Sequence, residues 1–161
     1  MEFRQALIVI SATALLLGAH QASARPDVTR DHCLAEWPGD VEMQHHCVIE
    51  QTRANTTLQK YSGPIRERCE SEWGVNFEMV MYCVKEQTAA QKRVATTPKD
   101  EIAAYCAGEW PEDYGMREYC ENEQRAAKAR LEGQSGRLLQ RCQGEWGVQY
   151  NMVEYCLEEG L

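Results

Sequence analysis

Between residues 27 and 161, apolar residues recur at helical spacing. In four segments a Met, a Tyr or His, and a Cys fall at i, i+3 and i+4, as in Met79, Tyr82 and Cys83. Upstream, a Cys and a Trp lie four residues apart, as in Cys69 and Trp73. Residues at these spacings share one face of a helix, whereas a half-buried strand alternates with a period of two. The pattern therefore predicts two amphipathic helices in each segment.

The four segments are copies of one motif, C-x2-E-W-[PG]-x4-M-x2-[HY]-C. The copies begin at Cys33, Cys69, Cys106 and Cys142, at intervals of 36, 37 and 36 residues. A fixed period of this size is typical of repeat proteins, in which each copy is one supersecondary unit stacked on its neighbours. We expect an all-α fold of four tandem αα-hairpins, arranged as a short α-solenoid or a compact helical array. The expected repeats are residues 27–61, 62–97, 98–134 and 135–161.

Each motif contains a helix breaker midway between its two cysteines. The residue after the Trp is Pro or Gly, and both residue types tend to end a helix. These residues are Pro38, Gly74, Pro111 and Gly147. Two residues later, three copies have an Asp or Asn where the second helix would begin, and both are favoured N-caps. They are Asp40, Asn76 and Asp113, whereas the fourth copy has Gln149, a poorer cap.

All eight cysteines lie in the motifs, and the two in each copy are 14 positions apart. On one continuous helix this separation would span about 21 Å, whereas a disulfide needs Cα atoms within about 7 Å. A turn between two helices resolves the conflict, so we predict one disulfide per hairpin. The predicted pairs are Cys33–Cys47, Cys69–Cys83, Cys106–Cys120 and Cys142–Cys156. The alternative is pairing between neighbouring copies, which would leave Cys33 and Cys156 to meet across the whole array.

The N-terminus has the features of a secretory signal peptide. An apolar run covers residues 6–18 and is followed by Ala22-Ser23-Ala24, a small-residue cleavage site. We predict a signal peptide over residues 1–24 and a single helical-repeat domain over residues 25–161. An uncleaved anchor is the alternative, although a membrane-spanning helix needs about 20 apolar residues. The prediction places the protein in the periplasm or outside the cell, where disulfides persist.

The charge balance is acidic, with 25 Asp and Glu against 17 Lys and Arg and a net charge of −8. An acidic chain is a poor ligand for nucleic acid and for anionic membrane surfaces. After signal cleavage no long apolar run remains, so we expect no membrane insertion. A basic protein partner or a divalent metal is compatible with this charge.

The large side chains of the motif are interpreted as a small core around each disulfide. A Trp contributes much of the burial in a core of this size, and Met fills gaps against sulfur and aromatic rings. These residues are Trp37, Trp73, Trp110 and Trp146, Met43, Met79, Met116 and Met152, and Tyr82, Tyr119 and Tyr155. For the tryptophans, the alternative is an exposed row of aromatic rings that holds an extended ligand.

A Glu precedes every Trp and would lie at a helix C-terminus, where the helix dipole disfavours it. We predict that it reaches across the turn to the first amides of the second helix, where a carboxylate is stabilised. These residues are Glu36, Glu72, Glu109 and Glu145. A second Glu recurs at Glu50, Glu86, Glu123 and Glu159, followed in the first three copies by Gln51, Gln87 and Gln124. This second group either contacts the neighbouring repeat or stays solvated.

Histidine is confined to the first copy of the predicted domain, at His32, His45 and His46. The Cys33–Cys47 disulfide would bring His32 close to His46, and two imidazoles at that range can bind Zn²⁺ or Cu²⁺. The alternative is a packing role, because His46 occupies the motif position held by Tyr in the other copies.

Familiar catalytic motifs are absent from the sequence: there is no G-x-S-x-G, no H-E-x-x-H, no Gly-rich phosphate loop and no C-x-x-C. Four near-identical copies also do not differentiate an acid from a base, as a paired-carboxylate hydrolase would require. We expect a non-enzymatic protein without a cofactor that binds another protein, with Arg53, Lys85, Lys92 and Arg125 as candidate contacts. A periplasmic metal-binding protein is the alternative. In layout the chain resembles exported Sel1-like repeat proteins, whose hairpins have a similar period and can carry one disulfide each.

Overall fold

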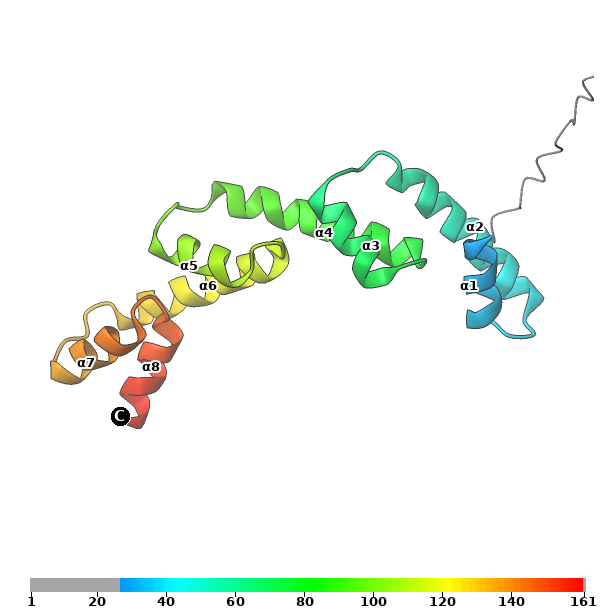
Figure 1. The fold of residues 1–161 in the computed structure, drawn as a ribbon. Helices are drawn as coiled ribbons and strands as arrows, with labels where there is room; N and C mark the ends of the chain where they lie inside the picture. Colours follow the sequence, from blue (N-terminus) through cyan, green and yellow to red (C-terminus); the bar gives the residue numbers. More distant parts are fainter. Residues whose placement is uncertain (1–26, 161) are drawn as a thin grey trace, which may run out of the picture.

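A computed structural model describes residues 27–160, and these residues form eight helices and no strand (Figure 1). Each hairpin has a first helix of 9 or 10 residues, called here its short helix, and a second helix, called its long helix, which has 18 to 20 residues in the first three hairpins and 10 in the fourth. In chain order they are α1 (Val28–Glu36), α2 (Val41–Leu58), α3 (Pro64–Trp73), α4 (Phe77–Thr96), α5 (Glu101–Glu109), α6 (Tyr114–Leu131), α7 (Arg137–Trp146) and α8 (Tyr150–Glu159). The predicted signal peptide, residues 1–24, lies outside the described residues.

The second helices of the hairpins form the spine of the array. Helix α2 contacts α4, α4 contacts α6, and α6 contacts α8. Each short helix packs against the long helix of its own hairpin, and a few side chains reach further: Arg66 of α3 donates to the Leu58 carbonyl of α2, and Tyr150 of α8 donates to Glu101 of α5. Within residues 27–160, no two short helices pack on each other. The hairpins therefore follow one another in an open row, with the short helices attached along the spine (Figure 1).

All four disulfides form within hairpins, as predicted. Their Cα–Cα distances are 5.7, 5.8, 5.7 and 5.8 Å for Cys33–Cys47, Cys69–Cys83, Cys106–Cys120 and Cys142–Cys156. A bridge that closes a loop of about 15 residues stabilises the folded state by about 3 kcal/mol in the chain-entropy model. Each disulfide therefore ties a short helix covalently to the spine.

The predicted N-caps are confirmed. The side chains of Asp40, Asn76 and Asp113 accept hydrogen bonds from the amides three residues ahead at 3.0, 3.2 and 3.0 Å. Gln149 makes no such bond at the start of α8. An N-cap satisfies one of the four amides that have no partner in the first turn of a helix.

A glutamine joins each hairpin to the next one. Gln51, Gln87 and Gln124 each lie one turn beyond the second Cys of their copy. The Gln87 side-chain oxygen accepts from the amide of Tyr114 at 2.8 Å, and its nitrogen donates to the Asp113 carboxylate at 2.9 Å. This glutamine therefore satisfies a first-turn amide of the following long helix and also bonds to the N-cap of that helix.

The other two glutamines make the equivalent contacts. Gln51 accepts from the Glu78 amide at 3.3 Å and donates to the Asn76 side chain at 3.2 Å. Gln124 accepts from the Asn151 amide at 3.3 Å and donates to the Asn151 side chain at 2.8 Å. Of the two possibilities that the sequence left open, these glutamines therefore contact the neighbouring repeat. We refer to these three contacts as the glutamine links.

Apolar contacts gather at two of the three junctions between hairpins. Leu58, at the end of α2, is buried against Val80 and Val84 of α4 and the second disulfide. Leu131, at the end of α6, is buried against Val153 of α8 and the fourth disulfide. At the junction between α4 and α6, the carboxylate of Glu121 is buried near Val94 and accepts a hydrogen bond from Thr97.

The glutamine links predict a specific loss of stability. Replacing Gln87 by Ala leaves the Tyr114 amide and Asp113 without this partner, which we expect to lower the free energy of unfolding by about 1–3 kcal/mol. Urea denaturation followed by circular dichroism measures the change. Gln91→Ala, one turn further along α4, is the matched control because Gln91 is exposed and makes no hydrogen bond within the described residues. Equal stability of the two variants would contradict the role of the link.

Candidate functional site

The tyrosines of the motif lie at the surface, so their predicted place in the core is wrong. The side chains of Tyr82, Tyr119 and Tyr155 are 61%, 61% and 51% exposed. Each immediately precedes the second Cys of its copy, and adjacent residues of a helix point about 100° apart. The short helix covers the face of the long helix that carries the Cys, so the neighbouring Tyr points into solvent.

The tryptophans are only partly buried. Trp37, Trp73 and Trp110 are 37–39% exposed, whereas Trp146 is half-buried against the cluster around the fourth disulfide. Each Trp lies at the end of its short helix, where only one neighbour can cover the ring. The prediction that each Trp is the central anchor of a core is therefore wrong for Trp37, Trp73 and Trp110. The alternative, an exposed row of aromatic rings, describes these three better.

The methionines of the motif lie beside these rings. Met43, Met79 and Met152 are half-buried, and Met116 is 36% exposed. The buried core consists instead of the cystines and of apolar residues on the long helices, such as Val80 and Leu58. The large side chains of the motif recur in every copy although most of them lie outside the buried core, which makes them candidates for binding.

In the third copy, the recurring residues of the motif line one groove of about 280 Å³. Trp110, Met116 and Tyr119 supply its apolar surface, and Glu109 and Glu123 supply two carboxylates. We call this the aromatic–carboxylate groove. The same five motif positions are Glu72, Trp73, Met79, Tyr82 and Glu86 in the second copy and Glu145, Trp146, Met152, Tyr155 and Glu159 in the fourth. The first copy has Glu36, Trp37, Met43, His46 and Glu50.

The carboxylates of this groove have no cationic partner. Glu109 and Glu123 form no salt bridge within the described residues. In the second copy Arg68 lies 3.8 Å from Glu72 and pairs more closely with Asp113, at 2.6 Å. The third copy has Tyr105 at the Arg68 position, and burial together with the charge of Glu109 raises the pKa of Tyr105. The groove is therefore a negatively charged surface beside aromatic rings.

The Glu before each Trp does not cap the second helix, so that prediction is wrong. Within residues 27–160, neither Glu36, Glu72, Glu109 nor Glu145 bonds to a first-turn amide of α2, α4, α6 or α8. In α4 and α6 the Asp or Asn cap and the glutamine of the preceding copy already bond to these amides. In α2 the Asp40 cap does so, and in α8 Gln124 does. The carboxylates are thereby left at the surface beside the Trp. The repetition of Gln four residues after the second Cys is the sequence signal that could have revealed this.

The histidines do not come together as a metal site. His32 lies with its Nε2 atom 3.3 Å from the carboxylate of Glu36. Among the described residues, the only three-donor group that contains it adds Cys47, whose sulfur is held in a disulfide and is not a thiolate ligand. His45 and His46 are exposed and lie outside this group. The structure thus offers one imidazole and one carboxylate in place of the predicted cluster.

Two of the four cations expected to contact a partner are engaged within the chain. Arg53 pairs with Glu50 at 2.8 Å, and Arg125 pairs with Asp100 of the α4–α5 connection. Lys85 and Lys92 are exposed and form no salt bridge within residues 27–160. Lys85 and Lys92 therefore stay available to a partner, whereas Arg53 and Arg125 do not.

Ion pairs reinforce two junctions at the same position of the repeat. Arg93 of α4 binds Glu118 of α6, and Arg130 of α6 binds Glu154 of α8, each through two hydrogen bonds. The hydrogen bonds from Arg93 and Arg130 lower the pKa values of Glu118 and Glu154. Partial burial opposes ionisation of Asp113, but hydrogen bonds from the Met116 amide, Gln87 and Arg68 outweigh it and lower its pKa.

Comparisons with known protein families, with curated proteins and with solved structures gave no match. None of the described helices combines the length and apolarity needed to cross a membrane. Four disulfides in one chain indicate an oxidising environment.

The junction ion pairs predict a dependence of stability on pH. A carboxyl group with a lower pKa in the folded state binds fewer protons than it does when unfolded, so stability rises with pH through that range. We expect full stability above the ordinary carboxyl range, and a loss of stability as pH falls below about 5 through the lowered pKa values. Urea titrations across this pH range should give a shallower loss for the double variant Glu118→Gln, Glu154→Gln.

The matched control for this experiment is the double variant Glu67→Gln, Glu132→Gln. Both residues are exposed and form no salt bridge within the described part of the chain. The control should follow the same pH curve as the unaltered protein. A wild-type curve for the junction variant would show that these pairs do not link protonation to folding.

Proposed function

We propose that this protein is an exported, non-enzymatic interaction module that binds an extended basic segment of a partner protein. The observation that carries the proposal is the exposure of Tyr82, Tyr119 and Tyr155 at one motif position in three copies. An exposed aromatic repeated once per structural unit suits a ligand that runs along the array.

The chemistry of the groove favours cations. A Lys or Arg side chain gains cation–π stabilisation over a Tyr or Trp face. In the third copy, Glu109 and Glu123 flank Trp110 and Tyr119 and have no salt bridge of their own among the described residues. A carboxylate next to an aromatic face can bind the charged end of the side chain while the ring covers its stem. The net charge of −8 would also steer a basic partner toward the protein.

Repetition multiplies this weak recognition. One cation–π contact at an exposed site contributes about 0.5–1 kcal/mol. Several such contacts on one continuous segment add through effective concentration, because later contacts form within the first complex. The spine holds successive copies in fixed order, so a partner with basic residues at the matching spacing would be selected over one with clustered charges.

The disulfides and the predicted signal peptide support a site of action outside the cytoplasm. A repeat domain of residues 25–161 with four bridges is suited to the periplasm or the extracellular space. The resemblance in layout to Sel1-like repeat proteins is consistent with such a role. A binding role requires no differentiated acid and base, and none is evident in the four near-identical motifs.

Peptide binding tests this proposal. We expect a labelled synthetic peptide in which Arg alternates with Ser to bind the oxidised protein, and added salt to weaken the complex. The triple variant Tyr82→Ala, Tyr119→Ala, Tyr155→Ala should bind at least tenfold more weakly, because it loses three contacts of about 0.5–1 kcal/mol each. Fluorescence anisotropy measures both dissociation constants.

Two controls separate recognition from general surface effects. The same peptide with Gln in place of Arg should not bind, because it lacks the cation. The triple variant Lys60→Ala, Gln91→Ala, Gln140→Ala changes three exposed residues outside the grooves and should bind as the unaltered protein does. If the tyrosine variant keeps full affinity, the proposed surface is wrong.

A further inference from the structure

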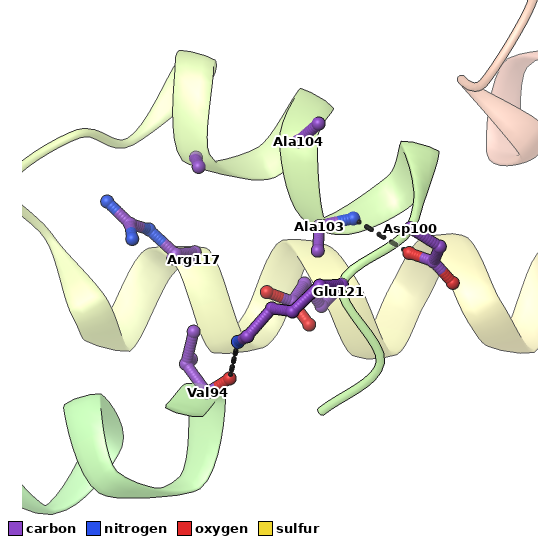
Figure 2. A pocket seen from close by; sticks show the side chains of 8 residues that line it. Val94, Asp100, Ala103, Ala104, Arg117 and Glu121 are labelled. Carbon is purple, nitrogen blue, oxygen red and sulfur yellow. Dashed lines mark hydrogen bonds between the residues drawn. The ribbon is translucent and has the colours of Figure 1, made fainter. Parts of the chain in front are cut away.

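The third hairpin encloses a second cavity, which is distinct from the aromatic–carboxylate groove. It has a volume of about 370 Å³ and lies between the end of α4 and the α5–α6 hairpin. Figure 2 shows Arg117, Glu121 and Ala103 around it, with Val94 of α4 on the other side. Lys99 and Asp100 of the α4–α5 connection complete the polar part of the lining.

Small residues on α5 open this cavity. Ala103, Ala104 and Ala107 line it, and none of the other copies has Ala at these positions. The equivalents of Ala103 are Arg30, Arg66 and Leu139; those of Ala104 are Asp31, Glu67 and Gln140; and those of Ala107 are Leu34, Glu70 and Gln143. Three larger side chains have therefore been replaced on one side of a single short helix.

Two charged residues on α6 line the cavity opposite the alanines of α5, at positions that are apolar in the neighbouring copies. Glu121 occupies the position of Val48, Val84 and Leu157. Arg117 occupies the position of Val80 and Val153, both fully buried, and of Gln44 in the first copy. Compared with the other copies, the third copy therefore has smaller side chains on its short helix and charged side chains on its long helix, and both line the same cavity.

Glu121 is buried with one carboxylate oxygen unsatisfied. The residue is only 1% exposed. Its Oε2 atom accepts a hydrogen bond from Thr97 at 2.6 Å and lies 3.5 Å from Arg125, whereas Oε1 has no partner. A buried acceptor without a donor costs about 1–3 kcal/mol, and more when it is charged. A ligand that brings a donor into the cavity would remove that penalty.

The cations of the cavity lack an acidic partner. Lys99 donates to the carbonyl of Val94 at 2.6 Å, and Arg117 donates to the carbonyls of Trp110 and Pro111. Neither forms a salt bridge within residues 27–160, because Asp100 is paired with Arg125. The lining thus has an acceptor that needs a donor and two cations that can bind an anion.

We propose that this cavity binds a small zwitterion with an aliphatic body, the chemistry of a free amino acid such as valine. Its ammonium group donates to Oε1 of Glu121, and its carboxylate binds Lys99 and Arg117. Its aliphatic part packs on Val94 and on the alanines of α5. Because Oε1 is inaccessible to solvent in the free protein, binding requires a side chain of the lining to move aside.

Calorimetric titration of the oxidised protein with three related probes tests this assignment. L-valine carries both charges, isobutylamine only the cation and isobutyrate only the anion. We expect valine to bind with one-to-one stoichiometry at millimolar concentration or below, and each single-charge analogue to bind at least tenfold more weakly. Absence of valine binding, or equal binding of valine and either analogue, would overturn the proposal.

Two variants assign the charges to their groups. Glu121→Gln should weaken valine and isobutylamine at least tenfold and leave isobutyrate unchanged. Arg117→Gln should weaken valine and isobutyrate and leave isobutylamine unchanged. This second variant keeps the local fold, because Gln44 at the same position of the first copy donates to the Trp37 carbonyl at 2.7 Å. If both variants bind all three probes as the unaltered protein does, the assignment fails.

Two further variants guard against changes in folding. Ala107→Gln introduces the side chain that the fourth copy has at this position, so it fills the cavity without changing its charges. It should abolish valine binding and keep the melting temperature. Glu123→Gln alters an exposed carboxylate two residues from Glu121 that lines the other groove. It should leave valine binding intact, and a loss there would show that the cavity is not the site.

Discussion

The whole arrangement depends on a disulfide that holds each short helix against one long helix. Helices of nine or ten residues are marginal by themselves, and no two of these four pack on each other within the described chain. In an ordinary two-layer solenoid, neighbouring first helices would pack on one another and share that burden. Here the covalent link replaces that layer. The consequence is a hairpin with one covered face, which leaves the Tyr beside each buried Cys in solvent.

The glutamine links explain how one hairpin leads to the next. A side chain from one long helix satisfies the open amides of the following long helix. The segment just after the second Cys of each copy is therefore the part that contacts the next copy. Gln51, Gln87 and Gln124 do this in three copies, and the fourth has Gly160 at the equivalent position. The Asp or Asn cap alone would satisfy an isolated hairpin, whereas cap and glutamine together specify a sequence of hairpins.

Much of this architecture is readable from the sequence because it rests on local rules. The 14-residue spacing of the cysteines requires a turn, and Pro38 or Gly74 with Asp40 or Asn76 supplies it. The predictions for individual side chains were wrong where burial depends on which helices pack against the residue, which local sequence does not specify. Trp73 and Tyr82 have core-forming chemistry, but only the absence of a second layer leaves them exposed. By charge alone, Glu72 is as suitable an acceptor for the first-turn amides of α4 as Gln51 is. Gln51 belongs to the preceding copy, so the sequence of one copy does not reveal this competition.

The four copies are built as two pairs, and this organisation places the polar junction in the middle. In the first and third copies the turn begins with Pro, and Gln44 or Arg117 donates to the carbonyl of the preceding Trp. In the second and fourth the turn begins with Gly, at φ +55°, and the same position holds a fully buried Val. The apolar clusters accordingly form within pairs, around Val80 and Val153. Between the pairs Arg117 replaces this Val, and hydrogen bonds and ion pairs act there together with buried apolar residues such as Val94.

That junction is therefore where a sequence can change without dismantling a hydrophobic core. Glu121 and Arg117 are accommodated there by Thr97, Arg125 and two turn carbonyls, and the alanines of α5 leave room beside them. The same substitutions beside Leu58 or Leu131 would place a charge in an apolar cluster, at a cost of several kcal/mol. Within a nearly uniform repeat, the physical distinction between apolar and polar junctions is thus sufficient to allow one copy to form a cavity lined by charged residues.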